Sequence, residues 1–409
     1  MVNLCMYFQV HQPYRLGKYQ VFDIGEKHEY FDDKKNREIM RKVSEKCYLP
    51  TNAALLDLIK KHGGKFKVSF SISGVALEQF EKYAPEVLES FKELAKTGCV
   101  EFLGETYYHS LSFLYSKDEF KKQIIKHRHK IMTLFGQRPA VFRNTELIYN
   151  NELAMFIEEM GYKAILAEGA DHILEWRSPN FVYKPRHCKD IRLLMKNYKL
   201  SDDIAFRFSN RGWKEWPLTV DKYSRWINAV NGNGEVINLF MDYETFGEHQ
   251  WEDTGIFEFL KVLPGEILRH PDNGFVTVSE AAKQTVRGDM DIHSVVSWAD
   301  LERDLSAWVG NMMQHSALNE IYAIEGQVLS SGDEKLIDDW RKLQTSDHFY
   351  YMCTKYFSDG DVHKYFNPYD SPYDCFIAYM NVLNDIKLRL KLGQKEKGAV
   401  CTEATIAEG

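Results

Sequence analysis

The first two thirds of the chain alternate short apolar runs with longer stretches in which apolar residues recur at helical spacing. Gly98, Gly136 and Gly161 stand where one pattern gives way to the other. Short apolar runs are typical of strands, and amphipathic stretches of ten or more residues are typical of helices. We expect strands at Leu4–Val10, Phe66–Ile72, Val100–Leu103, Ala140–Arg143, Ala164–Ala167, Val236–Met241 and Phe275–Val278, and helices at Asn52–His62, Val87–Lys96, Glu119–Phe135 and Asn151–Met160.

The repeated order of strand, helix and strand predicts an α/β fold with a parallel sheet and helical crossovers. The run Val236–Met241 is apolar throughout, as a strand buried on both faces should be. Both an open doubly wound sheet and a closed β/α barrel fit this order. The sequence contains no GxGxxG or P-loop motif, which argues against the nucleotide-binding form of the open sheet.

From about Val295 the strand signal ends and helical spacing dominates. The predicted helices there are Leu301–Ile321, Asp333–Lys342 and Asp374–Leu392. We therefore predict a β/α barrel over residues 1–285, a helical C-terminal region over residues 286–395 packed on the barrel, and a flexible tail over residues 396–409.

Charge and composition narrow the classes of partner. Lys and Arg total 52 against 59 Asp and Glu, a formal net charge of −7, which argues against a nucleic-acid or anionic-membrane partner. No apolar run approaches the length of a membrane span. The N-terminus reads as a first strand rather than a signal peptide, and the seven scattered cysteines indicate a reducing compartment, so we expect a cytoplasmic protein. The oligomeric state stays open.

Polar and titratable side chains recur just after the predicted strands. In parallel β/α folds the functional groups collect at the C-terminal ends of the strands and in the following loops. The residues in such places are His11, Glu105, His109, Arg143, Glu146, Asp242, Glu244 and His249. Glu101 lies inside a predicted strand, where it either faces the barrel interior or finds a buried partner, in the structural interpretation an ion pair that organises the site.

Glu146 and Asp242 are the pair that we single out. Two carboxyl groups on opposite sides of a sugar–sugar bond perform glycoside hydrolysis, with a separation of roughly 5–5.5 Å for retention and roughly 6.5–9.5 Å for inversion. The alternative is a metal site made of His and carboxylate ligands from His11, His109, Asp242, Glu244 and His249. The sequence has no HExxH motif to support that alternative.

Trp298, Asp300 and Asp304 begin the predicted helical region. Positions 300 and 304 would share one face of a helix, where acidic side chains suit its positive end. Two interpretations stay open. One is a capped first turn with Trp298 as a core anchor, and the other is a groove wall, in which the indole stacks on a sugar and the carboxylates accept hydrogen bonds from its hydroxyls.

Five regions, in order along the chain, resemble glycoside hydrolase family 57 and within it the α-amylase-type members. They are His11–Pro13, Gly98–His109, Val141–Glu146, Met241–His249 and Ser297–Asp304, of which D-Y-E-T-F-G-E-H from Asp242 is the most specific. Two positions depart from the family pattern: Cys99 stands where Gln is usual, and Arg143 stands where many members carry Trp.

The resemblance implies an incomplete seven-stranded β/α barrel followed by helices, and retaining cleavage of α-glucans without a metal or other cofactor. By position, Glu146 matches the family's nucleophile and Asp242 its acid/base. His11 and Glu101 match residues that line the sugar subsite at the cleavage point, and Trp298 with the acidic residues after it matches the region that closes the groove. The predicted substrate-binding residues are thus His11, Glu101, Glu105, His109, Arg143, Glu244, His249, Trp298, Asp300 and Asp304.

The leading hypothesis is therefore an α-amylase-like glycosidase whose partner is an α-1,4-linked oligo- or polysaccharide such as starch, glycogen or maltodextrin. A 4-α-glucanotransferase on the same scaffold differs only in the acceptor. A non-catalytic glucan-binding protein and a metal-dependent carbohydrate hydrolase or deacetylase are the alternatives from other classes.

Overall fold

The computed structural model describes residues 2–355 and 367–406, with side chains described as far as residue 392. The chain forms two compact units, and neither is a continuous stretch of sequence. The barrel unit is built from Met1–Gln12, Arg37–Tyr107 and Lys121–Asp304, and the helical unit from Pro13–Asn36, Tyr108–Phe120 and Leu305–Gly409. The sequence pattern predicts one change of character along the chain, near residue 285, whereas the structure has five crossings between the units.

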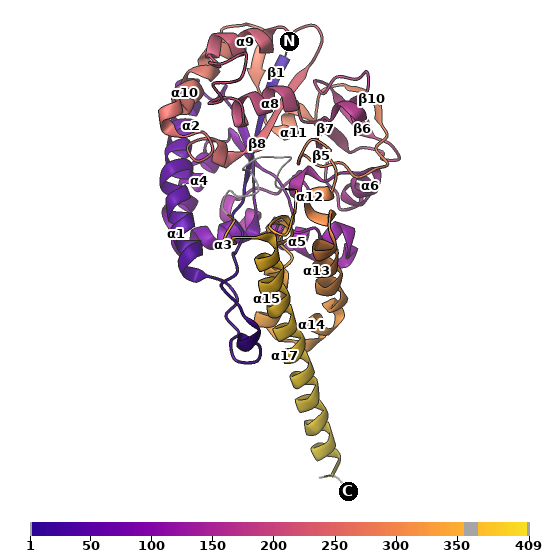
Figure 1. Cartoon of the computed structure of the whole chain (residues 1–409). Helices are drawn as coiled ribbons and strands as arrows, with labels where there is room; N and C mark the ends of the chain where they lie inside the picture. Colours follow the sequence, from indigo (N-terminus) through magenta and orange to yellow (C-terminus); the bar gives the residue numbers. More distant parts are fainter. Residues whose placement is uncertain (1, 356–366, 407–409) are drawn as a thin grey trace. The chain divides into compact units, whose positions relative to one another are not determined.

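Seven parallel strands surround the interior of the barrel unit (Figure 1). They are β1 (Val2–Val10), β2 (Val68–Ile72), β3 (Val100–Phe102), β4 (Val141–Phe142), β5 (Ala164–Ala167), β7 (Arg192–Met195) and β8 (Val236–Asp242). The ladder β3–β2–β1–β8 forms one sheet, and β4–β5–β7 belongs to the other.

A few backbone hydrogen bonds join the two sheets. The N–H of Gly104, just after β3, donates to the Val141 carbonyl of β4 at 2.9 Å. The N–H of Asn197, just after β7, donates to the Asn238 carbonyl of β8 at 2.9 Å. The strands thus follow one another round a ring that is not closed by a continuous ladder, and the predicted incomplete seven-stranded barrel is confirmed.

Three further strands lie outside this ring. They are β6 (Val182–Pro185), which runs antiparallel to β7, β10 (Val286–Met290), which pairs with β6, and β9 (Asn273–Phe275), which pairs with β1. The predicted strand Phe275–Val278 is wrong in its second half. Thr277 caps helix α11 (Val278–Ala281) there, because its side chain accepts from the Glu280 N–H while the Glu280 carboxylate reaches back to the Thr277 N–H.

Helices cover the outside of the ring. The four predicted in this part of the chain are confirmed as α2 (Leu49–Lys61), α4 (Pro85–Lys96), α5 (Lys117–Phe135) and α6 (Asn151–Glu159). The sequence analysis missed α1 (Asp33–Val43), α3 (Gly74–Tyr83), α7 (Asp171–Leu174), α8 (Tyr198–Ala205), α9 (Val220–Asn228) and α10 (Ile256–Ile267). Figure 1 shows α2, α4 and α10 side by side along one flank of the strands, in agreement with their mutual contacts.

Short turns complete the barrel unit and position its loops. These are the π-helical turn η2 (Ser44–Tyr48) and the 3-10 turns η4 (Thr145–Leu147), η5 (Tyr243–Thr245) and η6 (Glu252–Thr254). The turn η5 follows directly from β8, and two residues separate η4 from the end of β4. They therefore carry the loop residues that the sequence analysis placed after those strands.

The helical unit consists of η1 (Val21–Asp23), η3 (Ser112–Leu114), α12 (Ser306–Val309), α13 (Met312–Ala323), α14 (Glu325–Ser331), α15 (Glu334–Lys342), α16 (Ser346–Tyr350) and α17 (Pro372–Ile406). The first turn of the predicted helix Leu301–Ile321 is wrong, because the chain turns sharply at Asp300 and Arg303, which both have positive φ. Helix α17 continues to Ile406, past the predicted end at Leu392. Flexibility of residues 396–409 stays a prediction, and residues 407–409 lie outside the described part.

Hydrogen bonds explain why residues 13–36 belong to the helical unit rather than to the barrel. The buried carboxylate of Asp385, on α17, accepts from the Gly25 N–H at 2.6 Å and from the Tyr30 hydroxyl at 2.5 Å, and lies 2.9 Å from His28 Nδ1. These partners are more than 350 residues apart in sequence. Local periodicity carries no signal of such a contact.

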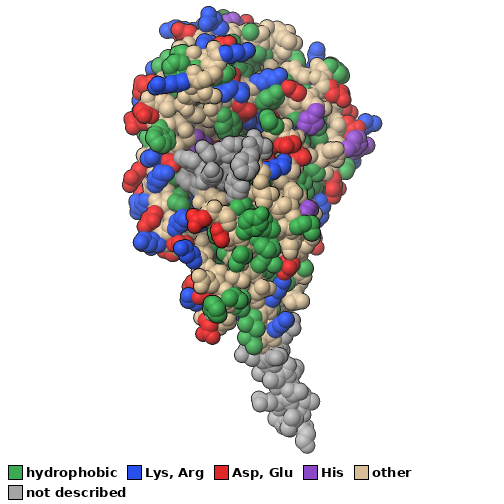
Figure 2. All heavy atoms as spheres, viewed as in Figure 1, with side chains coloured by type: hydrophobic (Ala, Val, Ile, Leu, Met, Phe, Trp, Pro, Cys, Tyr) green, Lys and Arg blue, Asp and Glu red, His purple; other side chains and the backbone are tan. Residues whose placement is uncertain are grey.

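The surface carries charges of both signs. On the face drawn in Figure 2, Lys and Arg side chains are interspersed with Asp and Glu rather than gathered into one basic field. Within the described ranges, no helix is long and apolar enough to cross a membrane.

Candidate active site

The inward-facing positions of the barrel strands change from apolar to polar near the C-terminal ends. Tyr7, Leu166, Leu194 and Phe240 belong to the buried core inside the ring. Because side chains alternate across a strand, the residues two positions further along point to the same side. At or beyond the strand ends, these polar residues are Gln9, Glu105, Arg143, Glu168, Lys196 and Asp242.

A hydrogen-bond network of buried side chains links β1 to the loop after β3. Gln9 Nε2 donates to Glu105 Oε1 at 3.2 Å, and Gln9 Oε1 accepts from the Tyr7 hydroxyl at 2.9 Å. Burial raises the pKa of Tyr7, and the charges of Arg143, Glu105 and Asp242 all act on its hydroxyl. The charged side chains at or after the ends of β3, β4 and β8 thus belong to one polar region around the Tyr7 hydroxyl.

The carboxylate of Glu146 is held by the indole of Trp298. Trp298 Nε1 donates to Glu146 Oε2 at 2.7 Å, and the backbone N–H of Trp298 donates to the Glu146 carbonyl at 3.1 Å. Glu146 lies in η4 with φ 58°, and Leu147 follows with φ 51°. Left-handed backbone at a non-glycine residue is costly and concentrates at functional sites, which fits a carboxylate held in a fixed direction.

Arg143 lies beside the same indole. Its guanidinium carbon is 4.7 Å from the centroid of the Trp298 ring. Arg143 is fully buried, and none of its three side-chain nitrogens has a hydrogen-bond partner within the described residues. A buried cation that is not hydrogen-bonded is costly, so the stacking on an aromatic face is its main visible support.

Asp242 ends β8, and Glu244 follows two residues later in η5. Glu244 is buried, accepts a hydrogen bond from the Tyr48 hydroxyl, and lies 3.5 Å from Gln12 Nε2. Burial, reinforced by the negative charge of Asp242, raises the pKa of Glu244 to about 8. Glu244 therefore keeps its proton at neutral pH.

Two histidines stand near these strand ends. His11, after β1, has its Nδ1 2.7 Å from the Ser73 hydroxyl oxygen at the end of β2. His249 lies in the loop after η5, where its backbone N–H donates to the Glu244 carbonyl at 2.8 Å. Burial lowers the pKa of His249 to about 4, so this imidazole is neutral in the folded protein.

Glu101 makes the contacts of a helix cap. Its carboxylate accepts from the Ser279 N–H at 2.8 Å and from the Ser279 hydroxyl, in the first turn of α11. On β3, Glu101 lies opposite Ser69 of β2. It precedes Glu105 by four residues along the chain. These described contacts are with Ser279 and are not the buried ion pair that was the structural alternative, and a role of Glu101 in substrate binding stays a prediction.

The other predicted site residues are placed as follows. His109 belongs to the helical unit, where it is buried and its carbonyl accepts from the Ser346 N–H at 2.9 Å. Asp300 and Asp304 do not share a helix face, because the chain between them turns. The Asp304 carbonyl accepts from the Ser297 hydroxyl at 2.6 Å, and its side chain is exposed.

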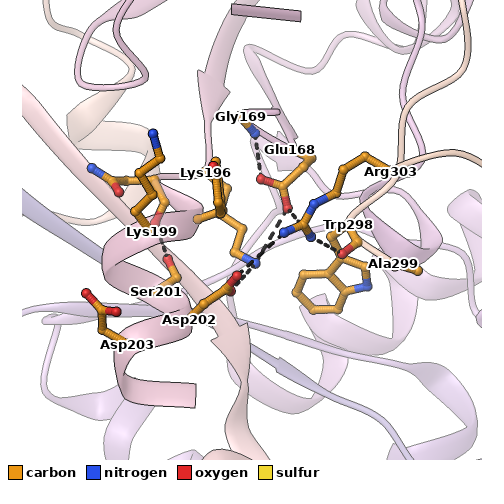
Figure 3. A network of polar contacts seen from close by, with 12 residues as sticks. Glu168, Gly169, Lys196, Lys199, Ser201, Asp202, Asp203, Trp298, Ala299 and Arg303 are labelled. Carbon is orange, nitrogen blue, oxygen red and sulfur yellow. Dashed lines mark hydrogen bonds and ion pairs between the residues drawn. The ribbon is translucent and has the colours of Figure 1, made fainter. Parts of the chain in front are cut away.

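The sequence analysis missed a buried ion network that reaches the same indole (Figure 3). It consists of Glu168, Lys196, Asp202 and Arg303. Glu168 directly follows the predicted strand Ala164–Ala167, so the rule that singled out Arg143 and Asp242 could have found it. Lys196 follows β7, a strand that the pattern did not predict.

A metal site of His and carboxylate ligands is the alternative to the carboxylate pair. Within the described part of the chain, no group of three or more His, Cys, Asp or Glu side chains is placed to hold a metal ion. The chemistry that these residues themselves offer is that of carboxylates, one of them fixed by an indole N–H.

Comparisons with known proteins identify the family. The model of glycosyl hydrolase family 57 matches residues 5–293. A protein named "Putative alpha-amylase" from Methanocaldococcus jannaschii is 45% identical over 399 residues, which cover 94% of this chain and 84% of that one. Among solved structures, a branching enzyme of the same family from Thermococcus kodakaraensis, in complex with glucose and additives, has a TM-score of 0.66 at 14% identity and covers 95% of this chain and 89% of that one.

A 4-alpha-glucanotransferase from Thermococcus litoralis also has a TM-score of 0.66, at 17% identity. The match covers 85% of this chain but only 56% of the transferase. At such identities the two solved structures show the fold alone. The family model and the 45% identical relative go further, and this chain belongs to glycosyl hydrolase family 57.

Proposed function

We propose that the protein is a retaining glycosidase that cleaves α-1,4-glucosidic bonds of starch-, glycogen- or maltodextrin-like glucans, with Glu146 as nucleophile and Asp242 as acid/base. The observation that carries the proposal is the hydrogen bond of 2.7 Å from Trp298 Nε1 to Glu146 Oε2, at the end of the barrel where catalytic groups collect. Such a bond stabilises the ionised form, which is the form that attacks. Family membership and the 45% identical relative's name support the substrate class.

The proposed reaction has two steps. In the first, a carboxylate oxygen of Glu146 attacks the anomeric carbon while Asp242 gives its proton to the departing glycosidic oxygen, so that a glycosyl ester forms on Glu146. In the second, Asp242 takes a proton from water, the water oxygen bonds to the anomeric carbon, and the ester bond breaks. Glu146 returns to its carboxylate form and Asp242 to its acid form.

The remaining predicted substrate-binding residues stay proposals with different structural support. Glu105 and Glu244 are buried acceptors near the strand ends that carry the two catalytic carboxylates, and His11 lies at the end of β1. Arg143 stands where many family members carry Trp, and its stacking on Trp298 supports a role in fixing that indole. For Glu101 and for the backbone carbonyl of His109, the described contacts are with Ser279 and Ser346.

Hydrolysis is proposed over transfer because the relative that is 45% identical carries the name of an amylase. If the acceptor in the second step is the hydroxyl of another glucan, the same residues make a 4-α-glucanotransferase. Incubation with maltoheptaose followed by chromatography separates the two. Shorter sugars alone support hydrolysis, a ladder of longer sugars contradicts it in favour of transfer, and unchanged substrate contradicts both in favour of a binding protein.

Two variants test the assigned residues. Glu146→Gln should lose turnover by several orders of magnitude and keep glucan binding, since the amide keeps the shape but cannot attack. Asp242→Asn should lose far more activity on maltoheptaose than on a glucoside with an activated leaving group, which needs little proton donation. Near-normal turnover of Glu146→Gln contradicts the proposal. Activity that EDTA abolishes would instead support the metal-dependent alternative.

A further inference from the structure

Four charged side chains from separate elements form a buried network beside the candidate nucleophile (Figure 3). Lys196 Nζ lies 3.1 Å from an Asp202 oxygen and 3.5 Å from a Glu168 oxygen. Arg303 lies 3.4 Å from Glu168 and 3.5 Å from Asp202. Each cation thus contacts both carboxylates, and the four charges balance.

The network contacts Trp298 in two ways. Arg303 Nη1 donates to the Trp298 carbonyl, and Lys196 Nζ lies 5.4 Å from the centroid of the indole ring. The pKa of Lys196 is raised by Glu168 and Asp202 against the effect of burial, so the ammonium keeps its charge. With Arg143 at 4.7 Å from the ring centroid, two cations lie over one indole.

The backbone on both sides of the contact needs such support. Glu146 has φ 58°, Asp300 φ 58° and Arg303 φ 55°, and each is a non-glycine residue in the left-handed region. The two loops are joined by paired bonds, since Tyr149 and Val296 exchange backbone hydrogen bonds of 2.9 and 3.0 Å. The N–H of Ser297 also donates to the Arg303 carbonyl at 2.9 Å, which closes the turn that carries Trp298.

A buried set of ion pairs is poor evidence for stability, because apolar residues of the same volume pack as well or better. Such a set does fix directions, since each charge must keep its partners. Here the partners come from the ends of β5 and β7, from α8 and from the loop 299–305, and Trp298 lies beside Lys196 and Arg303 (Figure 3). The indole N–H of Trp298 in turn fixes Glu146.

We infer that Glu168, Lys196, Asp202 and Arg303 are positioning residues: they lock Trp298 so that its indole N–H holds the Glu146 carboxylate in the orientation and the ionised state needed for attack. The inference rests on the proposed function, because it assigns these residues a part in the reaction of Glu146. None of the four needs to touch substrate.

The test compares network variants with neighbours on the same helix. Trp298→Phe removes the N–H and keeps a ring, Asp202→Asn weakens the network, and Arg303→Met removes the carbonyl contact. The controls are Asp203→Asn, whose carboxylate pairs with Arg207 at 2.6 Å, and Lys199→Met, whose exposed ammonium lies 3.4 Å from Asp171. The measurements are kcat and KM on maltoheptaose, the pH profile of kcat/KM, and thermal unfolding.

We expect Trp298→Phe, Asp202→Asn and Arg303→Met to lower kcat by roughly 100-fold, as for a misplaced catalytic group, with KM changed by less than about threefold. Loss of a bond to the charged form raises the pKa of a carboxylate, so the acid limb of the profile should move to higher pH by on the order of one unit. Arg303→Lys should recover part of the loss. The two controls should match the natural protein.

The inference is overturned if the network variants that fold keep the natural kcat and acid limb, or if only KM changes. If Arg303→Met fails to fold, Asp202→Asn decides, since it alters the network and leaves the indole N–H in place. Failure of the proposed function looks different. In that case Glu146→Gln itself keeps turnover, or mass spectrometry after reaction with a fluorinated glucosyl fluoride finds the trapped sugar on another residue.

Discussion

The two ends of the barrel interior differ in kind. Towards the amino ends of the strands the interior holds an apolar cluster that includes Cys5, Val141, Ala164 and Val236. Towards the carboxyl ends the inward residues are charged or amide side chains, which cost free energy to bury. The apolar end thus stabilises the fold, whereas the buried polar side chains at the other end lower its stability.

Two glutamates on one segment show the same contrast. Glu101 caps the first turn of α11 at the apolar end, and Glu105 accepts from Gln9 at the polar end. Both are carboxylates after or within β3, so residue type does not separate them. Their position along the strand does, and mutations at the two ends should therefore affect different properties.

The largest expected effect is at the polar end, at Arg143. Arg143→Met should lower turnover on maltoheptaose by on the order of 100- to 1,000-fold, because the cation stacked on Trp298 is lost from the surroundings of the proposed nucleophile. The free energy of unfolding should stay level or rise by about 1–4 kcal/mol, since a buried charge is removed. Kinetics and urea unfolding measure both. If turnover stayed intact and the free energy of unfolding fell strongly, Arg143 would instead be a structural residue.

The second effect is at the apolar interior, two residues before Lys196 on β7. Leu194→Ala should lower the free energy of unfolding by about 2–5 kcal/mol, because Leu194 is fully buried in the cluster inside the ring. Turnover per folded molecule should be unchanged. Val262→Ala, at an exposed position of α10, is the matched control and should cost less than about 0.5 kcal/mol. A loss of turnover in Leu194→Ala without a loss of stability would contradict the contrast between the two ends of the barrel.

The third effect is a pH dependence at Glu244. Its pKa of about 8 in the folded state lies above the ordinary carboxyl value, so the folded protein holds a proton that the unfolded chain has released. Stability from this group is present at low pH and is lost as the pH rises towards 8. His249, with a pKa of about 4, acts in the opposite direction, but only below about pH 6.5.

The clean window is therefore pH 6.5 to 8. The natural protein should lose about 2 kcal/mol more than Glu244→Gln across that window in urea unfolding. Parallel profiles for the two proteins would show that Glu244 is ionised in the fold. His249→Gln is the control, and it should keep the slope above pH 6.5.

The smallest effect separates the two glutamates directly. Glu101→Gln should cost about 1–2 kcal/mol of stability through its weakened bonds to Ser279 and leave turnover unchanged. Glu105→Gln should lower turnover by roughly tenfold, the equivalent of one charge-assisted hydrogen bond, with little change in unfolding. The reverse result, a catalytic defect in Glu101→Gln alone, would support the substrate-binding role predicted from the family resemblance.

The sequence pattern was reliable where a strand is apolar throughout, as with Val236–Met241 and Ala164–Ala167. It failed for β7, whose four residues begin with Arg192 and are followed by Lys196. A short apolar run flanked by charged side chains resembles a loop in the sequence. Only its pairing with the neighbouring strands identifies it as a strand. The missed Lys196 is a direct result, because the rule of looking just after each strand needs the strand first.

The sequence by itself determined the alternation of strands and helices, the apolar barrel interior and the polar residues after the strands, since each follows from which side chains avoid water over a few consecutive residues. Only the tertiary structure decided which of those residues meet. The contact of Glu146 with Trp298 joins positions 152 residues apart, and Glu168 reaches Arg303 across 135. Such pairs depend on how the ring of strands closes and on where a few residues take left-handed backbone, and neither leaves a periodic trace in the chain.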